Sequence, residues 1–323
     1  PFNEHPSGIR NKDGALVTVR QLPDASETGS PDTEDPVLAE VLGRVDFLQG
    51  LPPVALARCA EQLPIVDARR GKLYRQGEPT DGLHLVLCGK VKICCRTSDG
   101  RQRVLDVRGA GDVLGTVSTL ADTPRTTTAI AITDVSTALI GSRTLAGWIA
   151  EWPHVGEGLL RYMAERLGGA NRHLLDLVFD DVPCRVAKQL LHLAERFGSR
   201  SDRGWTVRHD LTQSEIAQLV GATRESVNKA MCAFAHRGWI ATDAKTTVIL
   251  RPELLAKRAG RLAAAGHAPQ HDPRRYERGY AVRPDARTTS ALWLITPGAA
   301  RTPATGSAAA DRVSASPDSQ AVQ

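Results

Sequence analysis

DLTQSEIAQLVGATRESVNKA, residues 210–230, is the stretch that decides the fold of the C-terminal part of this chain. It contains Thr212, followed three residues later by Glu215. This spacing is a capping box, in which each side chain accepts a hydrogen bond from the backbone N–H of the other residue. The apolar residues that follow recur at helical spacing. The stretch therefore predicts a helix over residues 213–220.

A second helix is expected after a tight turn. Gly221 can adopt the left-handed conformation that ends a helix, and Thr223 can cap the next one. The pattern predicts this second helix over residues 224–236. Residues 239–240 and 247–250 suit a two-stranded wing joined across a polar turn. Two short helices followed by a hairpin are typical of a winged helix-turn-helix.

The second helix has two chemically different faces when its residues are placed about 100° apart. One face is apolar and would pack on the domain: Val227, Met231 and Phe234. The other carries charged and amide groups that can bond base edges in the major groove: Arg224, Glu225, Asn228 and Lys229. The predicted DNA contacts also include polar residues near the two helix starts: Thr212, Gln213, Thr223 and Ser226. A helical hairpin with a solvated charged face is the alternative.

Charge is unevenly distributed along the chain. The 323 residues contain 41 Lys and Arg against 36 Asp and Glu, a net charge of +5, which excludes a simple polycationic binder. Residues 184–260 have 13 basic and 7 acidic side chains, whereas residues 1–183 carry a net charge of −4. A basic segment around the helix-turn-helix favours contact with a polyanion such as DNA. Chance solvation of a small surface is the alternative interpretation of the charge alone.

A long helical pattern spans residues 155–179. Its apolar residues recur at alternating spacings of three and four, the heptad pattern of two helices packed along their length: Leu160, Met163, Leu167, Ala170, Leu174 and Leu177. The pattern predicts the seam of a homodimer, and packing of the helix on its own domain is the alternative. Gly168 and Gly169 lie off the seam, so we expect them to weaken or bend the helix without interrupting the contact face.

Residues 65–140 consist of short alternating runs separated by glycine-containing turns. Such runs predict a β-sandwich or jelly-roll barrel, here called a β-roll. Asp99 and Gly100 mark a hairpin turn between two of the runs. The expected strands are residues 84–87, 91–95, 103–107, 127–132 and 136–140, and two short helices over residues 36–49 and 54–63 are expected before them.

Together these patterns predict an α+β fold with a β-roll sensor domain, a long dimerisation helix and a C-terminal winged helix-turn-helix. The predicted parts are a disordered leader (1–35), the β-roll domain (36–150), the dimerisation helix (151–180), the DNA-binding domain (181–259) and a disordered tail (260–323).

Composition and motifs narrow the function classes. No apolar run approaches the length of a membrane span, so no membrane association is expected. Six scattered cysteines without a CxxC pair favour a cytoplasmic protein that holds no metal. The sequence has no nucleophile elbow, P-loop or HExxH motif, and an enzyme is therefore not expected.

These residues resemble a known family. Residues 210–230 are similar to the winged helix of Crp/Fnr transcription regulators, and residues 179–183 resemble the hinge before that domain. Four upstream motifs resemble the family's cyclic-nucleotide-type β-roll: residues 77–79, 89–92, 111–115 and 124–126. The likeness covers about residues 36–259 and is closest to actinobacterial members of the cAMP receptor protein type.

The resemblance implies a homodimer that binds a palindromic double-stranded DNA operator with TGTGA-like half-sites, with RNA polymerase as a partner. It also implies that Arg224, Glu225 and Lys229 read bases. The enteric type has arginine where Lys229 stands, and lysine keeps the charge but loses the bidentate fork. The alternative from another class is a ligand-binding module whose basic domain contacts a protein, which would lack salt-dependent DNA affinity.

The resemblance further implies an effector pocket in the β-roll, with cAMP as the candidate effector. Backbone N–H groups, polar side chains and one cation would line it: Gly115, Thr116, Val117, Ser118, Arg125, Thr126 and Asn171. Thr116 replaces the family's ribose-binding glutamate, and Ala170 replaces a hydroxyl residue that recognises adenine. A family member that senses another signal, or binds DNA constitutively with a degenerate pocket, is the alternative.

Overall fold

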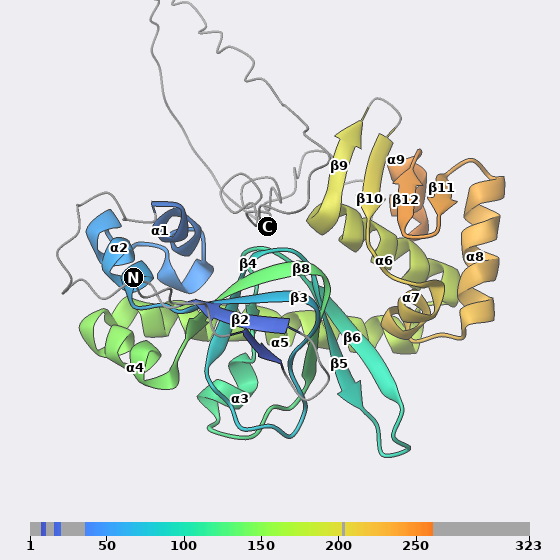
Figure 1. The fold of residues 1–323 in the computed structure, drawn as a ribbon. Helices are drawn as coiled ribbons and strands as arrows, with labels where there is room; N and C mark the ends of the chain where they lie inside the picture. The colour runs from blue at the N-terminus through green and yellow to red at the C-terminus, as the bar shows by residue number, and fades with distance from the viewer. Residues whose placement is uncertain (1–7, 11–15, 21–35, 202–203, 261–323) are drawn as a thin grey trace, which may run out of the picture. The chain divides into compact units, whose positions relative to one another are not determined.

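The computed structural model of this chain describes residues 8–10, 16–20, 36–201 and 204–260, and the structural statements below concern these residues. Figure 1 shows a sheet domain, a long helix (α5) and a mainly helical domain that contains a second, smaller sheet. The predicted leader outside residues 8–10 and 16–20, and the predicted tail from residue 261 onward, lie outside the described residues.

The first domain is built on an eight-stranded antiparallel sheet that curls into a half-barrel (Figure 1). Its strands follow the order β1-β2-β3-β8-β4-β7, and β5 joins both β6 and β8. The strands are β1 (Gly8–Arg10), β2 (Leu16–Arg20), β3 (Ile65–Tyr74), β4 (Leu83–Cys88), β5 (Val91–Arg96), β6 (Gln102–Arg108), β7 (Val113–Leu114) and β8 (Thr128–Ile140). This sheet confirms the β-roll class expected from the short alternating runs.

Short helices cover one end of this sheet. They are α1 (Pro36–Leu42), the 3-10 helix η1 (Asp46–Leu48), α2 (Pro53–Glu61) and α4 (Ser142–Glu151), whereas α3 (Thr116–Leu120) lies apart from them, between β7 and β8. Helix α2 begins at a proline, whose fixed φ suits the first helical turn. Apolar side chains of the helices and strands, among them Phe47, Leu85 and Trp148, share one buried cluster. Burial of this apolar surface holds the helices on the sheet.

Glycine permits the sharp reversals between strands. Gly100 has φ +78° in the turn between β5 and β6, which confirms the predicted hairpin. Gly89 has φ +85°, and a Cβ there would lie 2.1 Å from the backbone oxygen of Asp134. No side chain fits in that space, so the turn between β4 and β5 requires glycine.

Two predictions are wrong, one about the leader and one about the last strand of this sheet. Residues 8–10 and 16–20, predicted as part of a disordered leader, form β1 and β2, and β2 pairs with β3 from Val17 opposite Ala68 to Arg20 opposite Ile65. Residues 17–19 are β-branched and favour extended backbone, but their partner strand is distant in the sequence. β8 is one continuous strand where two were predicted, because β3 pairs with it on both sides of Asp134.

The long helix α5 (Pro153–Phe179) runs unbroken through Gly168 and Gly169. Its first turns pack on the sheet domain, where Val155 and Leu159 are buried. Further along, the predicted seam leaves large apolar side chains exposed: Leu160 by 74%, Leu167 by 64% and Leu174 by 59%. The structure therefore favours the predicted dimer seam over packing of this face on the helix's own domain.

The C-terminal domain contains α6 (Val182–Phe197), α7 (Gln213–Val220), α8 (Arg224–His236) and α9 (Pro252–Arg258). Its sheet has the order β11-β12-β10-β9, formed by β9 (Gly198–Ser201), β10 (Gly204–Arg208), β11 (Ile240–Asp243) and β12 (Thr246–Ile249). β11 and β12 are the predicted wing, to which β9 and β10 add a second hairpin. None of the helices in the described ranges is both long and apolar enough to cross a membrane.

Candidate DNA-binding surface and effector pocket

The caps predicted for the helix-turn-helix are present. The backbone N–H of Glu215 donates to Thr212 Oγ1 at 3.3 Å, and the backbone N–H of Thr212 donates to Glu215 Oε2 at 2.8 Å. Gly221 ends α7 with φ 65°. The backbone N–H of Ser226 donates to Thr223 Oγ1 at 3.2 Å, which starts α8. These bonds satisfy N–H groups that have no partner within the helix and so fix where each helix begins.

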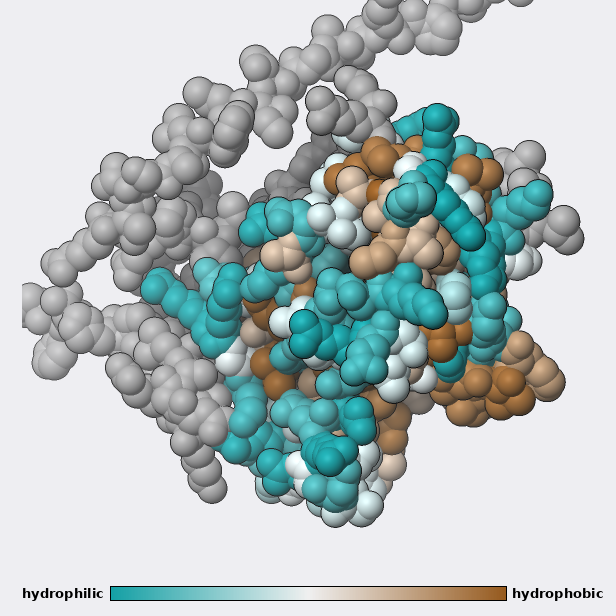
Figure 2. Space-filling model, turned by 90° about the vertical axis from the view of Figure 1, so that its right-hand side faces the viewer, coloured by the Kyte–Doolittle hydropathy of each residue, from teal (hydrophilic) through white to brown (hydrophobic). Residues whose placement is uncertain are grey.

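Helix α8 has the two faces expected from its sequence. Val227, Met231 and Phe234 are buried in the core of the C-terminal domain. The opposite face is exposed and holds the four predicted base-reading residues: Arg224, Glu225, Asn228 and Lys229. Figure 2 views the molecule from the side where α8 lies in Figure 1 and shows hydrophilic residues mixed with apolar patches on that face. The arrangement leaves one helix free to enter a major groove.

The other predicted DNA contacts lie near the starts of the two helices. Thr212, Gln213 and Thr223 are exposed, whereas Ser226 is half-buried and its hydroxyl lies 3.0 Å from Thr223 Oγ1. The hydroxyls of Thr212 and Thr223 both accept capping bonds, so these residues set the helix geometry. Backbone N–H groups and short polar side chains at helix starts are typical phosphate contacts, which position a protein on DNA without reading its sequence.

Contacts between the β5–β6 hairpin and α7 were not predicted. Lys92 Nζ donates to Glu215 Oε1 at 2.6 Å, and the backbone N–H of Val104 donates to Gln218 Oε1 at 2.8 Å. Burial alone would raise the pKa of the Glu215 carboxyl, but bonds from Lys92 and Thr212 lower it below its ordinary value. Apolar residues of β5 and β6 share a buried cluster with α6, α7 and α8. The sensor and DNA-binding domains are thus in direct contact.

The predicted effector pocket is organised around Arg125. This side chain is 1% exposed. Its Nη2 donates to the Gly82 carbonyl oxygen at 2.7 Å and to Asp81, and its guanidinium carbon lies 4.1 Å from the ring centroid of Tyr74. Among the described residues, Nε and Nη1 have no hydrogen-bond partner although both are buried. Two unused donors of a buried cation fit an anionic group such as a phosphate.

Asp81 forms an ion pair with one end of the Arg125 guanidinium. Its carboxyl pairs with Arg125 Nη2, and its Oδ2 lies 3.4 Å from His84 Nε2. Burial alone would raise the pKa of Asp81, but hydrogen bonds and charge from His84 and Arg125 outweigh it and lower the pKa to about 2. Asp81 is therefore a carboxylate at neutral pH, and it neutralises one side of the guanidinium while Nε and Nη1 stay available.

Gly115 faces those unused donors. It precedes α3 with φ 76°, and a Cβ there would lie 1.9 Å from Arg125 Nη1. The backbone thus approaches the guanidinium more closely than any side chain would allow. Helix α3 has only five residues, so the partial positive charge at its N-terminus is small. The Arg125 guanidinium therefore supplies most of the positive charge at this site.

The structure brings only part of the predicted effector set together. Thr116 and Ser118 are buried on α3, and Ser118 Oγ accepts from the backbone N–H of Thr126 at 3.1 Å. Val117 lies on the same helix but is 52% exposed. The side chain of Asn171 is exposed on α5. Of the predicted set, the structure therefore places Gly115 against Arg125 and joins Ser118 to Thr126, the residue that follows Arg125.

Sequence reasoning missed the residues that hold Arg125. Tyr74 comes from the end of β3, and Asp81 and Gly82 come from the loop before β4. Asp81 is followed by glycine, a pair typical of a turn, and its partner lies 44 residues away. Only the presence of a buried arginine could have signalled that a carboxylate was needed nearby.

Comparisons with known proteins agree with this geometry. The chain matches the cyclic nucleotide-binding domain family over residues 69–151 and the Crp-like helix-turn-helix domain family over residues 184–258. It is 48% identical over 221 residues to the CRP-like cAMP-activated global transcriptional regulator of Mycobacterium tuberculosis. The matched residues make up 68% of this chain and 99% of that regulator.

Solved structures show the same fold. FixK2 from Bradyrhizobium japonicum matches with a TM-score of 0.55 and 25% identity, over 63% of this chain and 99% of that chain. A transcriptional regulator of the CRP family from Thermus thermophilus matches with a TM-score of 0.51 and 26% identity, over 59% of this chain and 94% of that chain.

Proposed function

Because this chain belongs to the Crp/Fnr family of transcription regulators, we propose that it is a homodimer that reads a palindromic DNA operator through α8. We propose further that the pocket around Arg125 senses a phosphate-bearing effector, with cAMP as the first candidate, and that RNA polymerase is the partner at the promoter. The observation that carries the effector proposal is the pair of buried, unpartnered donors on Arg125.

The DNA-binding part of the proposal rests on α8. Its exposed face offers a guanidinium, a carboxylate, an amide and an ammonium, which together can bond guanine, cytosine and adenine edges. One α8 covers only a few base pairs. A second copy related by a two-fold axis would double the contacts and match a palindrome. The exposed apolar seam on α5 supplies a surface for that second copy.

The effector part rests on charge complementarity in the pocket. A phosphate would meet Nε and Nη1 of Arg125, with the backbone at Gly115 close enough to contribute. Such a ligand would lie beside α3, while contacts between β5, β6 and α7 link the same domain to the helix-turn-helix. An effector that favours one arrangement of these contacts would change DNA affinity by its differential binding to the two states.

Equilibrium binding to a palindromic duplex with TGTGA-like half-sites, measured with and without saturating cAMP, tests both parts. We expect tight, salt-dependent binding that cAMP strengthens by about tenfold or more, a coupling free energy of roughly 1.4 kcal/mol. A scrambled duplex of equal length is the control for sequence preference. Tight palindrome binding that cAMP leaves unchanged would contradict the effector proposal, and equal affinity for both duplexes would contradict the DNA proposal.

Gly115→Ala should remove the cAMP response through a single methyl group. The new Cβ would overlap Arg125 Nη1, displacing the donors that face the ligand. The control is Gly100→Ala, since Gly100 has a matching φ of +78° but nothing within 4 Å of the new Cβ. Both variants should lose about 1–2 kcal/mol of unfolding free energy from the left-handed backbone. Only Gly115→Ala should lose cAMP binding in calorimetry; equal cAMP affinity in the two variants would refute this pocket assignment.

A further inference from the structure

A buried histidine lies next to the Arg125 pocket and has no part in the function proposed above. His84 is on β4, and its side chain is 3% exposed. Its Nδ1 lies 3.2 Å from Thr137 Oγ1, and that hydroxyl donates to the Val66 carbonyl oxygen at 3.4 Å. Because the hydroxyl hydrogen is already used, Nδ1 is the donor in the bond to Thr137. The neutral imidazole of His84 therefore carries its proton on Nδ1 and none on Nε2.

The second ring nitrogen of His84 faces a carboxylate. Nε2 is buried and has no hydrogen-bond partner among the described residues, and Asp81 Oδ2 lies 3.4 Å from it. Without a proton, Nε2 directs a lone pair toward this negative oxygen, so the hydrogen-bonding capacity of both atoms goes unused. A proton on Nε2 would turn the same contact into an ion pair between an imidazolium and Asp81.

Asp81 is shared between this imidazole and the cation of the effector pocket. One carboxylate oxygen accepts from Arg125 Nη2, and the other faces His84. The charges of Arg125 and Asp81 cancel, and a bound phosphate diester would leave one negative charge in excess. A proton on His84 would balance that charge. The proton and the anionic ligand therefore stabilise each other, and by linkage each strengthens the binding of the other.

Tyr74 of β3 also packs on His84, with ring centroids 5.7 Å apart. Burial raises the pKa of the Tyr74 hydroxyl above its ordinary value, although the charges of Arg125 and of Arg166 on α5 oppose the rise. Tyr74 is therefore neutral near neutral pH and does not take up the proton. The residues opposite His84 on β7 and β8 are Leu114 and Leu139, which carry no charge.

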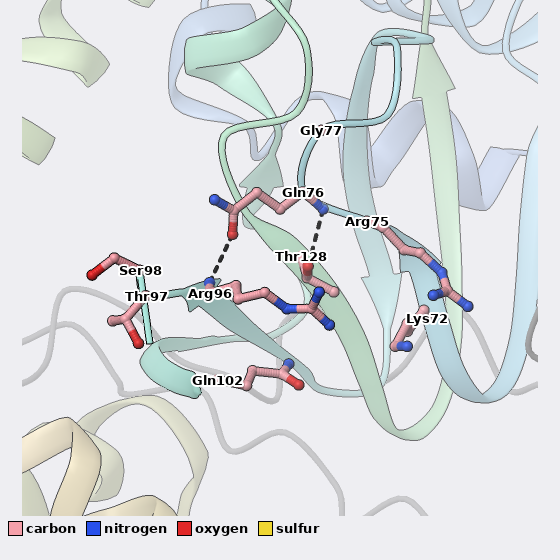
Figure 3. Close-up of a pocket in the computed structure, with 9 residues that line it drawn as sticks. All are labelled: Lys72, Arg75, Gln76, Gly77, Arg96, Thr97, Ser98, Gln102 and Thr128. Carbon is pink, nitrogen blue, oxygen red and sulfur yellow. Dashed lines mark hydrogen bonds between the residues drawn. The ribbon is translucent and has the colours of Figure 1, made fainter. Parts of the chain in front are cut away.

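Hydrogen bonds fix the backbone on which these charges lie. The Gly77 N–H donates to the Arg125 carbonyl oxygen at 2.8 Å, and the Arg125 N–H donates to the Glu78 carbonyl oxygen at 2.7 Å. Figure 3 shows the neighbouring bond, in which the Gln76 N–H donates to Thr128 Oγ1 at 3.0 Å. Because the backbone at Arg125 is held in this way, a proton on His84 would act on the ligand through charge at a fixed geometry.

We propose that His84 is a positioning residue that couples effector binding at Arg125 to the uptake of a proton. The protonated imidazole pairs with Asp81, and the guanidinium of Arg125 is then left to the phosphate of the effector. This inference rests on the effector pocket proposed above. It makes effector affinity rise as the pH falls through the range in which imidazoles titrate, between about pH 5 and pH 8.

Isothermal titration calorimetry of the full chain with cAMP, at about pH 7 in two buffers with different heats of ionisation, measures the protons taken up per bound cAMP. We expect an uptake of about 0.3–1 proton, and an affinity at least about fourfold higher at about pH 6 than at about pH 8. The phosphate diester of cAMP stays ionised throughout this range, so the proton must bind the protein.

Three variants locate the proton. His84→Gln cannot take a second proton and should bind cAMP without proton uptake, with affinities at the two pH values within about twofold of each other. Asp81→Asn removes the partner of the proton and should lose the uptake as well. Since Asp81 is 53% exposed, this variant should fold even if a change at buried His84 does not. His154→Gln removes an exposed histidine at the start of α5 and should keep the uptake of the unmodified chain.

The outcomes separate this inference from the proposed function. Binding of cAMP to the unmodified chain without proton uptake would overturn the role of His84 and leave the effector pocket standing. Absence of cAMP binding at every pH would overturn both. Uptake that persists in His84→Gln or in Asp81→Asn would place the proton on another group and would also overturn the inference.

Discussion

Replacing Arg224 by alanine is expected to abolish sequence-specific DNA binding while leaving weak nonspecific binding in place. Arg224 is the first residue of α8, and its side chain is exposed beside those of Glu225 and Asn228. Its guanidinium can donate two parallel hydrogen bonds to guanine, a contact worth about 1–3 kcal/mol of discrimination. A dimer would lose this contact in both half-sites, so operator affinity should fall by roughly 2–6 kcal/mol, or about 30-fold to 10⁴-fold.

The measurement is the ratio of affinities for a palindromic duplex and a scrambled duplex, at one fixed salt concentration. The ratio matters because nonspecific affinity depends on phosphate contacts that other cations also make. Arg143→Ala removes an exposed arginine from α4 and should leave the ratio within about twofold of the unmodified protein. If Arg224→Ala still preferred the palindrome, α8 would not be the recognition helix.

The features of α7 and α8 that could be predicted are those that depend on near neighbours. Thr212 bonds Glu215 three residues away, and Thr223 bonds Ser226 at the same spacing. Gly221 ends α7 because its own backbone adopts the left-handed conformation, which requires no contact with a distant residue. Helical periodicity then places the apolar face of α8 on the core and the charged face outside. Each of these signals lies within one or two helical turns, so the sequence alone contains it.

The features that could not be predicted join residues far apart in the sequence. Asp81 and Arg125 are separated by 44 residues, and Lys92 and Glu215 by 123. Nothing local to Asp81 distinguishes a turn aspartate from the partner of a buried cation. The same holds for β2, because its partner strand β3 lies far from it in the sequence. Partner choice of this kind is decided by packing and charge in three dimensions.

Leu167→Asp is expected to convert the protein into a monomer. Leu167 is 64% exposed at the middle of the seam, with Leu160 and Leu174 one heptad away on either side. Burying a leucine at an interface contributes about 1.5–3 kcal/mol, and a two-fold axis doubles the loss because each protomer provides one copy. Two carboxylates brought together in an apolar seam would add repulsion and desolvation. The dimer dissociation constant should therefore rise by at least about 100-fold.

Sedimentation equilibrium over a range of protein concentrations measures this change directly. The matched control is Val54→Asp, which adds the same carboxylate to a side chain that is 74% exposed on α2, outside the seam. We expect the control to remain a dimer, since an exposed carboxylate there meets no partner helix. Operator affinity should fall in Leu167→Asp and not in Val54→Asp, because only the dimer presents two copies of α8 at a fixed separation. A Leu167→Asp chain that sediments as a dimer would show that the two copies meet through another face, and the exposed leucines of α5 would then need a different partner.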